Sequence, residues 1–89
     1  MHSAAPWTVH VDRAVEKRLR QIPSRDAERV FSAITAMAVN PYSGDVAKMR
    51  GEEDVWRRRV GAYRIFFEVL SAARVVYVYR VERRTSKTY

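Results

Sequence analysis

The densest concentration of chemical groups in this sequence is a set of arginines around one short turn. Arg57, Arg58 and Arg59 precede Gly61-Ala62, and Arg64 follows it. A guanidinium group is always charged at physiological pH, and its planar fork of N–H donors matches the oxygens of a phosphate. The set therefore predicts a binding site for a phosphate-bearing anion.

The alternation of side chains in a β-hairpin decides which arginines share a face. With glycine at the first position of a two-residue turn, Val60 lies opposite Tyr63 and Arg59 lies opposite Arg64. One face is then apolar apart from Arg58, and it carries Trp56, Val60, Tyr63, Ile65, Phe67 and Val69. The other face carries Arg57, Arg59, Arg64, Phe66 and Glu68.

This second face is costly to fold without a ligand. Like charges directly opposite each other destabilise a sheet by up to about 1 kcal/mol a pair, so an anion bound between Arg59 and Arg64 would remove a penalty. Phe66 on the same face offers a ring on which a base could stack. The alternative is a solvated face on which Glu68 partly offsets the arginines.

Composition supports a polyanionic partner. The 89 residues carry a net charge of +7, and this charge is uneven: residues 1–47 hold six Lys/Arg and five Asp/Glu, whereas residues 48–89 hold eleven and five. Such asymmetry indicates a polyanionic partner, and the alternative is a soluble surface that happens to be basic. We expect one domain over 1–89. The lack of cysteine, signal peptide and long apolar run favours a cytoplasmic protein.

Periodicity predicts the elements that position the arginines. Residues 7–11 alternate as a first strand. Asp12 is predicted to cap a helix over 13–21, and Ser24 to cap a second helix over 25–39. The first helix would bury Val15 and Leu19, and the second Val30, Ile34 and Met37 with Phe31 and Ala38 beside them.

From residue 54 the period becomes two, which predicts strands at 54–60, 63–70 and 74–81. The order β-α-α-β-β-β predicts an α+β fold with a helical hairpin packed on one face of a mainly antiparallel sheet. Tyr77 and Tyr79 alternate along the last strand, and we expect them in the core rather than on an RNA platform. Arg83 and Tyr89 in the tail would reach the rim of the arginine face, or belong to a frayed terminus.

Several segments in a fixed order resemble the RelE/ParE toxin superfamily. They are Lys48-Met49-Arg50-Gly51, the stretch from Trp56 to Phe67, and the tail from Arg83 to Tyr89. The helix ending in Leu19-Arg20-Gln21-Ile22-Pro23 and the later Asn40-Pro41 also match the family pattern.

The resemblance implies a RelE-like toxin, a ribosome-dependent endoribonuclease that cleaves mRNA in the A site and is neutralised by a cognate antitoxin. It places the catalytic groups at Arg57, Arg59, Arg64, Arg83 and Tyr89, with Arg84 as the substitute for Arg83. RNA-binding roles would fall to Lys48, Arg50, Phe66, Arg84 and Lys87.

The general base is the open point of that mechanism. RelE relatives often carry a lysine on the second strand, and lysine can be tuned toward a neutral pKa. Here the run is all arginine, so Tyr89 or a water relayed by the ribosome would have to accept the proton. No pair of His, Asp or Glu has convincing metal-ligand spacing, and we predict no metal or cofactor. A ParE-like inhibitor of DNA gyrase and a non-cleaving homologue that binds antitoxin or RNA are the alternatives.

Overall fold

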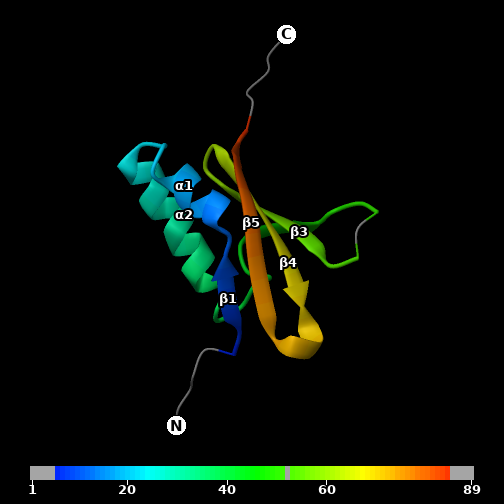
Figure 1. Ribbon diagram of the computed structural model, residues 1–89. Coiled ribbons are helices and arrows are strands. Elements are labelled where there is room, and N and C mark those ends of the chain that lie inside the picture. Colours follow the sequence, from blue (N-terminus) through cyan, green and yellow to red (C-terminus); the bar gives the residue numbers. More distant parts are fainter. Residues whose placement is uncertain (1–5, 52, 85–89) are drawn as a thin grey trace.

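The computed structural model describes residues 6–51 and 53–84, in which two helices cover one face of a five-stranded sheet (Figure 1). The elements in chain order are β1 (Thr8–Val11), α1 (Arg13–Leu19), α2 (Ser24–Ala36), β2 (Asp45–Lys48), β3 (Val55–Val60), β4 (Tyr63–Leu70), a 3₁₀ turn (Ser71–Ala73) and β5 (Val75–Arg83). The predicted α+β class is confirmed, and so is the helical hairpin on one face.

The sheet has the strand order β1-β5-β4-β3-β2. β5 pairs parallel with β1 and antiparallel with β4, and the other two pairings are antiparallel. The chain leaves β1, forms both helices and resumes at the opposite edge, so that β5 returns beside β1 at the end. We call the sheet face away from the helices the open face.

The turn between β3 and β4 forms as the sequence predicts. Gly61 has a φ of 57°, a left-handed conformation that glycine adopts without steric cost. Val60 pairs with Tyr63 and Arg59 with Arg64, which confirms the predicted register. Alternate residues of the hairpin, including Arg57, Arg59 and Arg64, therefore lie on the open face.

The helices begin close to where they were expected and end earlier. The Asp12 carboxylate accepts a hydrogen bond from the Ala14 N–H at 2.9 Å, which confirms the predicted cap of α1. Ser24 was predicted to cap α2, but it is the first helical residue and Pro23 occupies the cap position without a side-chain bond. α2 ends at Ala36 because residues 37–39 tighten into turns ahead of Pro41.

The core lies between the helices and the sheet, and it holds twelve buried residues: Val15, Val30, Ala33, Ile34, Met37, Tyr63, Ile65, Phe67, Val69, Val76, Val78 and Val81. Phe31 was expected beside them, but 56% of it is exposed. Val30, Ala33, Ile34 and Met37 complete the inward stripe of α2, so Phe31 falls on the outer side of the helix.

The short strand β2 was not predicted. Its four residues, Asp45 to Lys48, lie between the second predicted helix and the strand predicted from residue 54. Pairing with β3 is what makes them a strand, with Asp45 opposite Arg59 and Lys48 opposite Trp56. In the described part of the chain, no helix is long and apolar enough to cross a membrane.

Candidate phosphate-binding site

Four arginines, three from β3 and β4 and one that directly follows β5, line one concavity on the open face, with a volume of about 250 Å³. They are Arg57, Arg59, Arg64 and Arg84, and we call this site the arginine pocket. Three of the four were predicted to gather here from the hairpin alternation. The fourth arrives because the Arg84 N–H donates to the Ala62 carbonyl at 2.6 Å, which holds the end of β5 against the β3–β4 turn.

Arg57, like Arg58 on the helix side of the sheet, has a buried donor without an acceptor among the described residues. In Arg57 this donor is Nη1. A buried donor without an acceptor costs about 1–3 kcal/mol, because the water it has lost is not replaced. Arg57 lines the arginine pocket, so an anion there would supply that acceptor once a shift of the side chain exposes the nitrogen.

Acidic side chains neutralise only part of this pocket. Asp45 lies 3.5 Å from the Arg59 guanidinium, and both side chains are largely solvated. Glu82 lies opposite Arg64 in the β4–β5 ladder, but it pairs with Arg80 instead. Within 6–51 and 53–84, no ion pair engages Arg57, Arg64 or Arg84, so the pocket keeps an excess of positive charge.

Arg83, predicted as a catalytic residue, does not lie in the pocket. It is opposite Tyr63 in the ladder, and residues directly opposite each other project to the same face. Because Tyr63 is in the core, Arg83 lies on the helix side. Arg84 occupies the place in the pocket that was expected for Arg83. Lys87 and Tyr89 lie outside the described residues.

Tyr63 anchors the turn that presents Arg64. Its hydroxyl donates to the Asp26 carboxylate of α2 at 3.1 Å. Burial raises the pKa of Tyr63 above its ordinary value, and the bond to Asp26 and the charge of that carboxylate add to the rise. The phenol therefore stays protonated and keeps the hairpin tip attached to α2.

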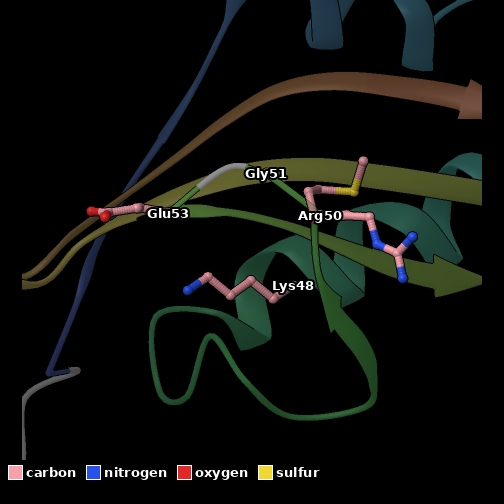
Figure 2. A pocket seen from close by; sticks show the side chains of 5 residues that line it. Lys48, Arg50, Gly51 and Glu53 are labelled. Carbon is pink, nitrogen blue, oxygen red and sulfur yellow. The ribbon is translucent and has the colours of Figure 1, made fainter.

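Lys48 and Arg50, predicted to bind RNA, lie apart from the arginine pocket. Lys48 shares its face with Trp56 on the helix side of the sheet. With Met49, Gly51 and Glu53, the two residues line a wider open concavity of about 570 Å³. Figure 2 shows the Arg50 guanidinium pointing away from Lys48 and Glu53.

Phe66 is on the open face as predicted, but its ring is not an open platform. Only 8% of the residue is exposed, and the Arg80 guanidinium lies over the ring at 5.4 Å. More accessible rings on this face belong to Tyr77 and Tyr79, which were predicted to be core. Val76 and Val78 fill the core positions of β5, so the intervening tyrosines face the other way.

Arg58 also lies where the hairpin alternation places it, on the helix side. Its Nη1 donates to the Ala33 carbonyl of α2 at 3.4 Å. A Cβ added at Gly44 would come within 2.7 Å of the Arg58 guanidinium carbon, so the two are closely packed. Gly44 precedes β2, and Arg58 thereby supports the strand that carries Asp45.

Comparison with known proteins shows the family to which this chain belongs. The family model for the ParE toxin of type II toxin–antitoxin systems, parDE, matches residues 7–87. The chain therefore belongs to this family, and its resemblance to the RelE/ParE superfamily is confirmed. The RelE1 protein of Methanocaldococcus jannaschii is 25% identical over 81 residues, which cover 88% of this chain and 90% of that protein.

Solved RelE structures share the fold. The Pyrococcus horikoshii RelE–RelB complex matches with a TM-score of 0.82 and 23% identity, over 92% of this chain and 99% of that one. The isolated Escherichia coli RelE toxin matches with a TM-score of 0.77 and 20% identity, over 91% and 87%. The Mycobacterium tuberculosis RelBE2 toxin–antitoxin complex matches with a TM-score of 0.76 and 21% identity, over 89% and 99%.

Proposed function

We propose that this chain is a toxin that cleaves mRNA in the ribosomal A site, as a metal-independent endoribonuclease acting in the cytoplasm. The observation that carries the proposal is the arginine pocket, in which four permanent cations line one concavity and the buried Nη1 of Arg57 has no acceptor among the described residues. A backbone phosphate of RNA fits that combination of charge and donors.

The reaction that such a pocket favours is attack by a ribose 2′-OH on the adjacent phosphorus. The new P–O2′ bond forms as the P–O5′ bond breaks, which leaves a 2′,3′-cyclic phosphate and a 5′-hydroxyl. Negative charge builds up on the phosphate oxygens at the transition state, and preorganised cations are usually the largest catalytic term. Arg57, Arg59, Arg64 and Arg84 would supply them.

Proton transfer needs a group that arginine cannot provide, because guanidinium stays protonated. We assign the base to Tyr89, or to a water relayed by the ribosome, which would accept the 2′-OH proton. A proton from solvent or the same relay would reach the leaving 5′-oxygen. Tyr89 is also suited to stack on a base beside the scissile phosphate.

The test is Arg64→Ala in translating extracts, with mRNA ends mapped after addition of the protein. We expect wild type to cut within codons on ribosomes and Arg64→Ala to leave mRNA intact while remaining folded. Arg25→Ala is the matched control, because Arg25 is an exposed arginine on α2, far from the open face. A folded Arg64→Ala protein that still cuts would exclude Arg64 from the site.

Gyrase inhibition is the second candidate, and the ParE family match favours it. The absence of a lysine from the arginine run also suits a protein that binds without doing chemistry. Gyrase–DNA complexes trapped by wild type, together with intact mRNA, would establish this function in place of cleavage.

We propose a cognate antitoxin as the regular partner. An acidic or amphipathic segment would cover the arginine pocket and offset its charge. The P. horikoshii structure is a RelE–RelB complex and the M. tuberculosis structure is a toxin–antitoxin complex, which supports the proposal. Co-expression with a short acidic or DNA-binding protein from an adjacent reading frame should give a stable complex and restore growth; separate elution of the two proteins would count against it.

A further inference from the structure

The open face carries a second feature next to the arginine pocket. Tyr77 lies opposite Glu68 of β4 and opposite His10 of β1, so its ring is on the open face. The β4–β5 ladder pairs Phe66 with Arg80 and Phe67 with Val78, and this shift adds Tyr79 to β5 as an extra residue. The extra residue brings Tyr79 and Arg80 together between the buried Val78 and Val81.

The two tyrosine rings form an ordered pair. Their centroids are 6.1 Å apart and their planes differ by 27°, which is a stacked arrangement. The Tyr77 hydroxyl donates to the Asp12 carboxylate at 2.6 Å, and this bond fixes the ring at the far end of the pair. Both residues are half-buried, so they form a pre-ordered surface on the sheet.

The tyrosine pair leads toward the arginine pocket. Arg80 follows Tyr79 and lies over Phe66, and Phe66 is paired with Arg57 across β3 and β4. Strands are spaced about 4.8 Å apart, so β5 lies about 10 Å from β3 and Arg57. One or two nucleotides of a single strand can therefore span the distance between the tyrosine pair and the arginine pocket.

We propose that Tyr77 and Tyr79 form a base-stacking subsite for single-stranded RNA whose phosphate occupies the arginine pocket. The inference rests on the proposed function for its substrate class. Every base offers a π face, so such a subsite accepts any sequence and adds roughly 5- to 150-fold in affinity per stacked base. It also sets the direction of the bound strand, with bases laid toward β1 and the phosphate held between β3 and β4.

The test compares two probes, a trinucleotide RNA and inorganic tripolyphosphate, which carries charge but no base. We expect Tyr79→Leu to weaken RNA binding at least about fivefold and to leave tripolyphosphate binding unchanged. Tyr42→Leu is the control, because the Tyr42 ring is more exposed than Tyr79 but contacts Trp7 and Trp56 away from the open face. A single-stranded DNA of the same sequence measures how far binding depends on the 2′-OH.

The outcomes separate this inference from the proposed function. If Arg57→Gln weakens both probes while Tyr79→Leu binds RNA as wild type does, the stacking subsite is wrong and the arginine pocket stands. Equal weakening of both probes by Tyr79→Leu would mean a role in folding, and would also overturn the inference. If Arg57→Gln leaves both probes bound as tightly as before, the proposed function fails.

A measurement on wild type avoids any effect of substitution on folding. In NMR titrations, the ring resonances of Tyr77 and Tyr79 should shift on addition of RNA and stay in place on addition of tripolyphosphate. Rings that respond equally to both probes, or to neither, would contradict base stacking on this pair.

Discussion

At the scale of single residues, the arginine pocket combines unfavourable folding energetics with favourable ligand chemistry. Arg59 and Arg64 are directly opposite in the ladder, and Arg57 has a buried donor without an acceptor. Both features cost free energy in the unliganded protein, and a bound phosphate would relieve both. Such conflicts between local stability and residue choice are typical of functional sites.

Replacing one arginine of the opposed pair tests whether the two charges repel each other. Arg64→Gln should raise the free energy of unfolding by about 0.5–1 kcal/mol at low salt, because it removes one of two opposed charges. Urea unfolding measures the change, and added phosphate should narrow the difference by stabilising wild type more. A loss of stability, beyond that of the control Arg25→Gln, would show that the two charges do not repel.

Asp45 has a different role at the same scale, as the acidic partner of Arg59. Asp45→Asn should tighten phosphate or RNA binding roughly threefold, because it removes the repulsion between the Asp45 carboxylate and the bound phosphate. Two unit charges about 7 Å apart in water interact with about 0.6 kcal/mol. Titration at low salt measures it, with Asp54→Asn, an exposed acidic residue outside the arginine pocket, as the control. Weaker binding would instead mean that Asp45 orients Arg59 for the ligand.

At the scale of elements, side-chain contacts through and around the sheet hold the open face in place. Arg58 packs on Gly44 ahead of β2, Tyr63 connects the β3–β4 turn to α2, and Tyr77 connects β5 to the start of α1. Each link joins elements that are far apart in sequence. The geometry of the arginine pocket therefore depends on residues that do not line it.

Gly44→Ala tests the contact beneath β2. Gly44 has a φ of 87°, and its added Cβ would meet the Arg58 guanidinium, so we expect a loss of about 1–3 kcal/mol in urea unfolding. Gly51→Ala is the matched control, because Gly51 has a φ of 81° but nothing within 4 Å of its added Cβ. Equal losses in the two variants would assign the whole effect to backbone conformation.

The link between β5 and α1 predicts a pH dependence. The hydrogen bond from Tyr77, and then that from the Ala14 N–H, lower the pKa of Asp12 below its ordinary value of 3.8. A carboxyl with a lowered folded pKa stabilises the fold above the unfolded value and loses that contribution as the pH falls through the folded value. Stability should therefore decline in acid below about pH 4, partly through Asp12.

Tyr77→Phe keeps the ring and removes the donor, so its stability should fall less steeply over the same acid range. Urea unfolding midpoints across the range measure the slope, and Tyr42→Phe serves as control. Identical acid profiles for Tyr77→Phe and wild type would show that the hydroxyl does not hold the Asp12 pKa down.

At the scale of the whole molecule, the fold separates two kinds of surface. The helices cover one face of the sheet (Figure 1) and complete the core. The open face carries the arginine pocket and the tyrosine pair. The C-terminal half also carries six of the seven net charges. With four arginines in one concavity, the open face should attract a polyanion, as the proposed function requires.

The salt dependence of RNA binding follows from that charge. Each phosphate neutralised on a single strand contributes about 0.7 to the slope of log affinity against log salt concentration. Arg64→Ala should reduce the slope by about that amount, and Arg25→Ala should leave it unchanged. An unaltered slope for Arg64→Ala would mean that Arg64 contacts no phosphate.

The hairpin, and the pairs of residues that lie opposite each other in it, follow from local sequence alone. Gly61-Ala62 fixes a two-residue turn, and once a turn is fixed the alternation of side chains is forced, which places Arg57, Arg59 and Arg64 together. The α+β class follows in the same way from local periodicity. These are short-range constraints, so no knowledge of the rest of the chain was needed.

The residues that join those three arginines are set by pairing between distant strands. β5 alternates valines with tyrosines, and either set could have faced the helices. The extra residue at Tyr79 then reverses the alternation beyond it, which sends Arg83 to the helix side and Arg84 to the pocket. Asp45 reaches Arg59 through the pairing of β2 with β3. Pairing between distant segments sets all of these positions, and local sequence patterns do not encode it.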